Sequence, residues 1–231
     1  EDANVLEIGC GEAGVLKAFC DNGNTCFGID LSSSRIERGK KLLTDEIQQK
    51  RICLYAGDVH DADKFEHLFG QIDLIVLKDA IEHIYDQERI LSLLHKFTTG
   101  TAAVFLAFPP WLNPFGGHQQ LAGSFLKYVP WFHLLPRKLY RGLLKLCGET
   151  NTQINVLMEI YETRLSISKF EILLTKTNWQ LKKRQFYLFN PGYEVRFGIK
   201  PRKQLELISD IPWVRDFFST AVYYLINERS S

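Results

Sequence analysis

The first 108 residues alternate short apolar runs with longer polar runs, and this alternation restricts the chain to very few folds. The apolar runs have the length of strands and contain few charged residues; they cover residues 5–8, 25–29, 52–56, 72–77 and 102–108. Continuous apolar strands are typical of a parallel sheet covered on both faces. The order strand–helix–strand therefore predicts βαβ units and a doubly wound, mostly parallel α/β sheet.

Composition supports a globular protein of ordinary size. The chain has 231 residues, of which 45% are hydrophobic and 24% are charged, and this excludes a disordered tail or a collagen-like fibre. Its 28 Lys and Arg residues nearly balance 27 Asp and Glu residues, for a formal charge of +1. A balanced charge disfavours an overall electrostatic binder of nucleic acid, so we expect no nucleic-acid partner.

Cysteine usage and hydropathy point to a reduced compartment. The five cysteines form no C-x-x-C pair, and an odd count without such pairs indicates free thiols instead of a disulfide or zinc framework. The longest apolar run, residues 102–108, is far shorter than the ~18 residues of a membrane span. No signal-peptide pattern is present, so we expect a cytoplasmic protein.

The alternation stops at Pro109 and Pro110. Residues 109–148 contain no Asp or Glu, but they carry five Lys or Arg residues and seven aromatic residues. We expect residues 109–165 to be a largely helical, acceptor-binding cap inserted after the fifth strand. Residues 1–108 would form the ligand-binding core and residues 166–231 would complete the same sheet. Runs at 180–189 and 193–200 predict an antiparallel strand pair, and residues 214–226 predict a final helix.

The turn after the first strand carries the chemical signal. From Gly9 it reads G-x-G-x-x-G, a pattern that lets the backbone approach a ligand and places helix N–H groups beside it. Asp30 ends the second strand and is placed to accept hydrogen bonds from ribose hydroxyls. Asp58 follows the third strand, where it could meet an adenine amino group. Together these positions predict an adenosine-containing ligand across the carboxyl ends of strands one to three.

Four stretches resemble the motifs of the class I methyltransferases, which use S-adenosylmethionine; they are residues 5–11, 28–32, 57–59 and 77–84. The resemblance implies a seven-stranded sheet and S-adenosylmethionine as cofactor. It also implies that Gly9 and Gly11 let the backbone pass close to the methionine part of the cofactor and that Glu7 orients their loop. The backbone at residues 77–78 would face the cofactor's amino end. The cofactor-binding residues implied in this way are Glu7, Gly9, Cys10, Gly11, Asp30, Leu31, Asp58, Val59, Leu77 and Lys78.

Two alternative functions stay open. A nicotinamide-dependent oxidoreductase would also use the glycine spacing and Asp30. Against it, Glu7 belongs to the methyltransferase pattern, and none of the nine tyrosines is followed by Lys four residues later. The second alternative is a non-catalytic module that binds an adenosyl cofactor.

Two histidines are candidates for the general base or for a group that positions the methyl acceptor. A hydroxyl acceptor needs alignment, exclusion of water and a base, and His83 and His118 follow the fourth and fifth strands. Their plainer interpretations are a packed helix-start residue for His83 and an ordinary loop residue for His118. We expect O-methylation by elimination, because no N-methylation motif of the Asn/Asp-Pro-Pro-aromatic type follows strand four. No carboxylate cluster late in the sheet indicates a metal, so a metal-independent reaction is expected.

The acid-free residues 109–148 suggest the kind of acceptor. Positive charge suits an anionic molecule, and aromatic rings pack against sugar faces. The plainer interpretation is a helical cap with solvated lysines and buried aromatic residues. The functional one is a small-molecule or glycan acceptor, anionic or lipid-linked, with peripheral membrane contact through this insertion.

Overall fold

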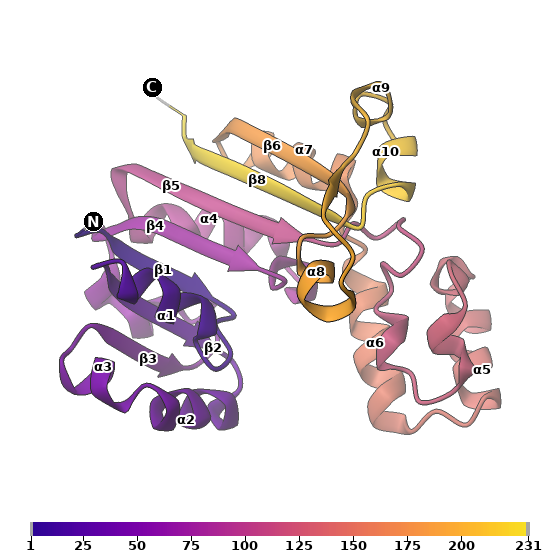
Figure 1. Ribbon diagram of the computed structural model, residues 1–231, viewed down its shortest axis with the longest axis horizontal. Coiled ribbons are helices and arrows are strands. Elements are labelled where there is room, and N and C mark those ends of the chain that lie inside the picture. The colour runs from indigo at the N-terminus through magenta and orange to yellow at the C-terminus, as the bar shows by residue number, and fades with distance from the viewer. Residues whose placement is uncertain (1, 230–231) are drawn as a thin grey trace.

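A computed structural model describes residues 2–229, and one sheet organises them (Figure 1). The strand order is β3-β2-β1-β4-β5-β8-β6-β7. The first five strands pair in parallel and confirm the predicted doubly wound arrangement; they are β1 (Asn4–Ile8), β2 (Thr25–Asp30), β3 (Ile52–Ala56), β4 (Ile72–Lys78) and β5 (Thr98–Phe108). Their carboxyl ends all lie at one edge, where the predicted ligand site must be.

The remaining strands are antiparallel to their neighbours. β8 (Ala221–Glu228) lies between β5 and β6 (Trp179–Phe189) and pairs antiparallel with both. β7 (Arg202–Lys203) adds two residues at the far edge of β6. The resemblance implied seven strands; the eighth is this short edge strand.

Two local predictions near the C-terminus were wrong. Residues 193–200 are not the partner of β6, because α8 (Gly192–Phe197) forms there and ends at Gly198 with φ +68°. Residues 214–226 are not one helix: α10 (Val214–Phe217) is a single turn, and β8 follows it. The apolar spacing of residues 214–226 fits a helix, but the open hydrogen-bonding edges of β5 and β6 favour a strand from Ala221 onward.

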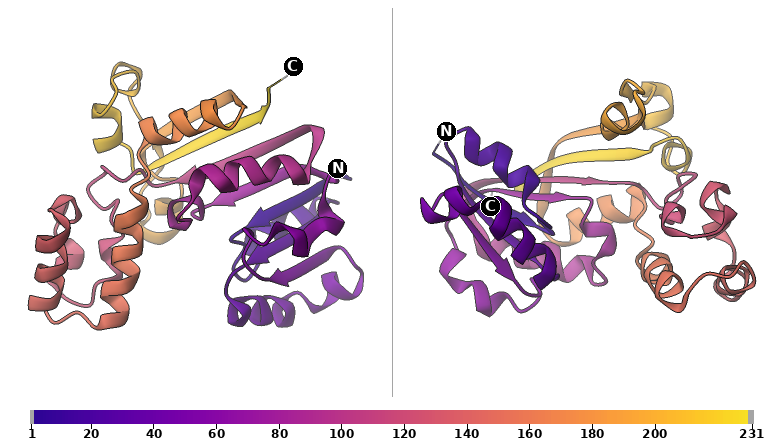
Figure 2. Two further views of the ribbon diagram at one scale, coloured as in Figure 1. Left: turned by 180° about the vertical axis from the view of Figure 1, so that it is seen from behind. Right: turned by 60° about the horizontal axis from the view of Figure 1, so that its bottom comes forward.

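Helices cover the two faces of the sheet unequally (Figures 1 and 2). In Figure 1 the helices in front of β1–β3 are α1 (Gly14–Asp21), α2 (Ser33–Leu42) and α3 (Thr44–Gln48). Behind the sheet lie η1 (Ala62–Leu68), α4 (Gln87–Phe97) and α7 (Ile167–Lys176), which bury the larger apolar cluster. Asp86 caps α4 by accepting from the Arg89 N–H, as the sequence suggested.

The chain leaves the sheet after β5, and residues 109–165, which we call the cap, contain helices and no strand of the described sheet. The cap contains η3 (Gln119–Leu121), η4 (Phe125–Tyr128), η5 (Phe132–Leu134), α5 (Arg137–Leu146) and α6 (Asn151–Thr163). It has an apolar cluster of its own around Trp111, Tyr140 and Tyr161. In Figure 1 the cap lies beyond the carboxyl ends of the parallel strands. The division of the chain into three parts stays a prediction.

The segment between β6 and β8 folds over the same end of the molecule. It contains α8, β7, α9 (Glu206–Ser209) and α10. Within residues 2–229, no helix combines the length and apolar character needed to cross a bilayer.

Candidate functional site

The turn between β1 and α1 is built around two glycines. Gly9 has φ +77° and Gly11 has φ +56°, a left-handed conformation that side chains rarely adopt. A Cβ on Gly9 would come 2.7 Å from the Ala80 Cβ, and one on Gly11 would overlap the Arg35 guanidinium. The third glycine of the pattern, Gly14, begins α1 and has open space around it. Two of the three glycines are therefore required by the chain's own sterics.

Asp30 joins this turn to the loop after β2. Its Oδ2 accepts a hydrogen bond from the Gly11 N–H at 2.8 Å, and its Oδ1 accepts one from the Ser32 N–H at 2.8 Å. The Arg35 guanidinium lies 3.9 Å from Oδ2. The carboxylate is thus fixed by two backbone donors, and each oxygen retains a lone pair for a further donor.

A cavity of about 480 Å³ opens at the carboxyl ends of β1 to β4. This volume lies within the range of small-molecule sites. Five of the ten predicted cofactor-binding residues line it: Gly9, Asp30, Leu31, Asp58 and Val59. Gly11 lies behind Asp30, and the cavity wall does not include it or the other four, which are Glu7, Cys10, Leu77 and Lys78. Their roles stay predictions.

The cavity also has wall residues that the sequence analysis did not single out. They include Ile8, Arg35, His60, Asp79, Ala80 and Tyr85. Ile8, His60, Asp79 and Ala80 stand beside the predicted residues at the strand ends, whereas Arg35 lies in α2 and Tyr85 follows η2. The motif positions would have indicated the first four if neighbouring positions had been included.

Glu7 and Lys78 lie beside the cavity instead of in its wall. Glu7 is 3% exposed, and burial raises the pKa of its carboxyl to about 8, so the group is protonated at neutral pH. The group predicted to orient the glycine turn is therefore an uncharged carboxyl. The Lys78 ammonium pairs with Asp79 at 2.7 Å. Burial also raises the pKa of the Cys10 thiol, which keeps it from acting as a thiolate.

The structure brings together the two candidate histidines, which are far apart in the sequence. His83 ends η2 (Ile81–His83) after β4, and His118 precedes η3 in the cap. Their ring centroids are 4.9 Å apart. His83 lines the cavity, whereas His118 approaches it through His83. The interpretation of His83 as a packed helix-start residue does not explain this pairing.

Both imidazoles are uncharged at neutral pH. Burial lowers the pKa of His118 to about 4, with His83 as a further cause, and burial lowers the pKa of His83 below its ordinary value. A neutral imidazole has a free lone pair, which can accept a proton or bind a cation. The pair can therefore act on a hydroxyl placed against the cavity wall.

Glu82 is the functional candidate that the sequence analysis did not name. It is 3% exposed, and its Oε1 lies 3.9 Å from the His83 Nε2 and 4.0 Å from the His118 Nε2. Burial raises its pKa to about 8. The adjacent Glu and His in the stretch after β4 were a usable signal, but only the fold shows that His118 joins them.

The cap holds this cluster in place from the other side. The Thr163 hydroxyl, at the end of α6, donates to the Glu82 carbonyl at 2.6 Å. The Trp111 N–H donates to the Leu165 carbonyl at 2.8 Å and so joins the two ends of the cap. The turn after β4 is consequently fixed between the sheet and the cap.

Comparison with known proteins finds a family similarity in the N-terminal part of the chain. Residues 6–102 match the methyltransferase-domain family. An uncharacterised protein of Rickettsia prowazekii (strain Madrid E) is 30% identical over 118 residues, which are 48% of this chain and 46% of that protein. A probable chloroplastic tocopherol O-methyltransferase of Oryza sativa subsp. japonica is 27% identical over 106 residues, 45% of this chain and 28% of that protein. The matched segment thus spans less than half the length of these curated relatives.

Solved structures agree on the fold. The geranyl diphosphate C-methyltransferase of Streptomyces coelicolor A3(2), in complex with Mg²⁺, geranyl diphosphate and S-adenosyl-L-homocysteine, is similar with a TM-score of 0.62. The match covers 99% of this chain and 74% of that chain at 11% identity. At this identity the likeness is one of fold.

Proposed function

We propose that this chain, whose residues 6–102 match the methyltransferase-domain family, is a class I methyltransferase with S-adenosylmethionine as cofactor, and that it methylates a hydroxyl oxygen of a small-molecule or glycan acceptor. The observation that carries the proposal is the cavity wall at the ends of β2 and β4. Asp30, placed for a ribose, and His83, which leads to His118, line the same cavity. The proposed cofactor site and the two uncharged imidazoles therefore lie next to each other.

The cavity residues fit the cofactor in chemistry. Asp30 offers carboxylate lone pairs to ribose hydroxyls, and the glycine turn leaves no Cβ between backbone and ligand. When bound, S-adenosylmethionine supplies an electrophilic methyl group on a positively charged sulfur. The chain's task is then to align the acceptor, exclude water and remove one proton.

The two imidazoles are suited to remove the hydroxyl proton of the acceptor. In the proposed reaction an imidazole nitrogen of His118 or His83 takes the acceptor's hydroxyl proton as the oxygen forms its bond to the methyl carbon. The carbon–sulfur bond breaks and its electron pair stays on sulfur. The products are the methyl ether, S-adenosylhomocysteine and a protonated imidazole, which returns its proton to solvent. The His118 side chain is only 12% exposed and is therefore largely shielded from water.

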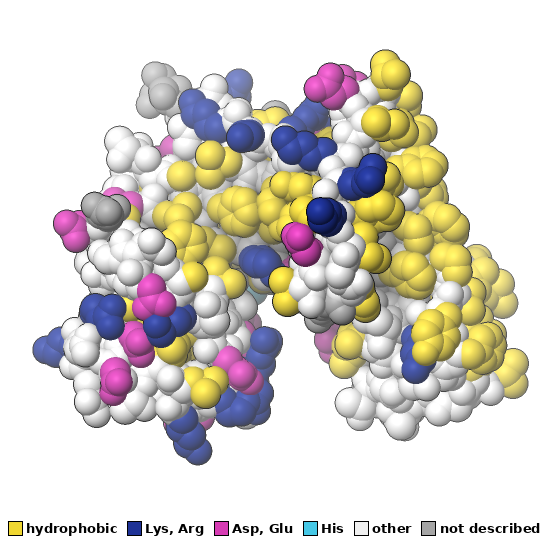
Figure 3. Space-filling model, in the orientation of Figure 1, with side chains coloured by type: hydrophobic (Ala, Val, Ile, Leu, Met, Phe, Trp, Pro, Cys, Tyr) yellow, Lys and Arg dark blue, Asp and Glu magenta, His cyan; other side chains and the backbone are white. Residues whose placement is uncertain are grey.

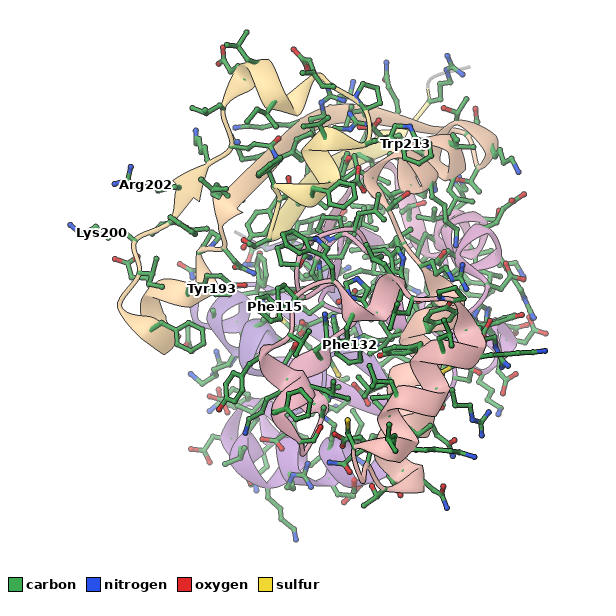
Figure 4. All side chains as sticks on the ribbon, turned by 90° about the vertical axis from the view of Figure 1, so that its right-hand side faces the viewer. Phe115, Phe132, Tyr193, Lys200, Arg202 and Trp213 are labelled. Carbon is green, nitrogen blue, oxygen red and sulfur yellow. The ribbon has the colours of Figure 1, made fainter. Side chains whose placement is uncertain are left out.

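The surface around the cap supports an apolar or lipid-linked acceptor. Large hydrophobic side chains are exposed along one side of the molecule, from α9 and α10 to α5 (Figure 3). We call this the apolar face; its most exposed members are Phe125, Tyr128, Leu139, Leu146, Leu205, Leu207 and Trp213. Figure 4 looks onto this side, with Lys200 and Arg202 pointing outward. Large exposed apolar patches on a protein surface mark sites that bind another protein, a ligand or a membrane.

We infer that the apolar face rests on an anionic membrane surface on the cytoplasmic side. Its cap portion has no acidic residue between positions 109 and 148, and Lys200, Arg202 and Lys203 stand beside α8. Cations around an apolar area match anionic headgroups around acyl chains. This arrangement would present a lipid-linked anionic acceptor to the cap.

Liposome flotation tests the membrane part of the proposal. We expect the chain to float with vesicles containing phosphatidylserine and to stay in solution with purely neutral vesicles. The double variant Leu207→Ser/Trp213→Ser should lose most of this binding, because both side chains are at least 72% exposed on the apolar face. Leu42→Ser is the matched control, since Leu42 is 68% exposed on α2 away from that face. Equal flotation of the wild type with both vesicle types would remove the membrane inference.

Calorimetric titration tests the catalytic part. S-adenosylhomocysteine should bind and NADH should not. Binding of NADH alone would indicate an oxidoreductase. Cofactor binding without methyl transfer from labelled S-adenosylmethionine to any lipid or glycan extract would indicate a non-catalytic module. Label that appears in an acceptor and survives mild base would exclude a methyl ester, and identification of the labelled product as a methyl ether would support O-methylation of a hydroxyl.

A further inference from the structure

The buried carboxyl of Glu82 has no hydrogen-bond partner among the described residues. Within residues 2–229, neither carboxyl oxygen has a hydrogen-bond donor, although the residue is only 3% exposed. An unpartnered buried polar group costs about 1–3 kcal/mol, and more when it is charged. Such a group in an otherwise well-packed turn indicates that a ligand is part of the folded site.

The two histidines beside it also lack hydrogen bonds. Across the described part of the chain, neither the His83 nor the His118 ring makes one, whereas the buried His133 ring makes two. His133 bonds Gln119 at 2.8 Å through Nδ1 and the Trp111 carbonyl at 2.7 Å through Nε2. The unsatisfied atoms of Glu82, His83 and His118 all face one another, with their ligand atoms within 4.8 Å.

We propose that Glu82, His83 and His118 together bind one divalent first-row transition-metal ion. Metal–nitrogen and metal–oxygen bonds of about 2.0–2.2 Å place neighbouring ligand atoms about 3–3.5 Å apart. Glu82 Oε1 now lies 3.9 Å from His83 Nε2 and 4.0 Å from His118 Nε2, so a small inward movement of the side chains would bring these atoms to the required spacing. The half-exposed His83 side chain has room for this movement. Two imidazoles with one carboxylate suit zinc, cobalt, iron or manganese better than magnesium or calcium.

The position of the ion would give it a role in the reaction. Three protein ligands leave coordination positions open, which is typical of catalytic sites, and His83 lines the cofactor cavity. An ion there would attract the acceptor's oxygen and make its hydroxyl easier to deprotonate. This part deepens the proposed function and replaces the expected metal-independent reaction. With the ion bound, the lone pairs of both imidazoles would be used on the metal, so the hydroxyl proton would pass to solvent instead of to an imidazole, and loss of His118 would lower turnover through loss of the ion. Ion binding itself does not depend on which acceptor is used.

Titration with Co²⁺, followed by visible absorption, tests the site directly. The purified, metal-free chain should bind one Co²⁺ with weak d–d bands and no intense near-ultraviolet thiolate band, and Zn²⁺ should displace it. Glu82→Gln and His118→Ala should each weaken Co²⁺ binding at least about tenfold, the smallest loss usual at metal sites. His67→Ala is the matched control, because His67 is exposed on η1 outside the cluster and should bind as the wild type does.

Two results would overturn the proposal. One is a folded wild-type chain that binds neither Co²⁺ nor Zn²⁺. The other is Co²⁺ binding that His118→Ala leaves unchanged; this variant is the safer one to fold, because His118 stands in a loop. Calorimetry with S-adenosylhomocysteine on the same samples separates the two proposals. Cofactor binding without metal binding would overturn the metal site alone, and metal binding without cofactor binding would overturn the proposed function alone.

Discussion

Replacement of Asp30 by alanine tests whether the cavity at the ends of β1 and β2 is the cofactor site. The change removes the carboxylate that accepts from the Gly11 and Ser32 N–H groups at 2.8 Å each. It also removes the acceptor proposed for the ribose hydroxyls. The side chain is smaller, so no overlap is introduced.

The magnitude follows from these contacts. Hydrogen bonds to a charged group contribute about 1.5–3 kcal/mol, so S-adenosylhomocysteine affinity should fall about 10- to 150-fold. The buried Gly11 N–H loses its partner, and this should lower the free energy of unfolding by about 1–3 kcal/mol. Asp30→Asn keeps one acceptor oxygen but loses the charge, so both of its effects should be smaller.

Isothermal titration calorimetry at fixed ionic strength measures the affinity, and urea unfolding measures the stability. Asp63→Ala is the matched control, because the Asp63 side chain is 85% exposed on η1 and should change neither quantity. A folded Asp30→Ala variant that binds S-adenosylhomocysteine as tightly as the wild type would show that the cofactor lies elsewhere.

Three further predictions concern the proton path, the glycine turn and a buried acid. His118→Ala should lower turnover about 100-fold or more with cofactor affinity unchanged, as calorimetry and a labelled-methyl assay would show; equal turnover contradicts its role. Gly9→Ala should cost at least about 1–2 kcal/mol in urea unfolding, since φ is +77° and the new Cβ meets Ala80; an unchanged midpoint refutes the steric argument. Burial raises the pKa of Asp216 to about 6, above its value in the unfolded chain, so stability should fall as pH rises from about 4 to 6. Asp216→Asn keeps an acceptor for the Ile167 N–H and should be more stable at pH 8 by up to about 3 kcal/mol but not at pH 4; a difference independent of pH contradicts this sign.

Much of the fold could be predicted from the sequence because the parallel half is encoded locally. Each strand from β1 to β5 contains a short apolar run, and each connection between them contains a helix. The glycine turn is local in the same sense, since Gly9 and Gly11 are needed by their own backbone angles. Asp30 and Asp58 were found because parallel strands carry their carboxyl ends to one edge.

The C-terminal part could not be predicted in this way. Residues 214–226 have an apolar spacing that suits a helix, yet β8 forms there and pairs with β5 and β6 on both sides. Hydrogen bonds to two strands distant in sequence outweigh a weak local preference. The apolar face is also invisible in composition, because exposure depends on which side chains the cap and the sheet cover.

Glu82, His83 and His118 show how local pattern and tertiary packing contribute differently to the site. The motif residues were enough to indicate the cofactor class and to mark His83 and His118 as candidates. Only the folded chain places the rings 4.9 Å apart and directs the unpartnered Glu82 carboxyl toward both. The physical reason is that cofactor recognition uses backbone turns specified within a few residues. The acceptor end is formed where the turn after β4 meets a cap, and only packing between distant segments brings these together.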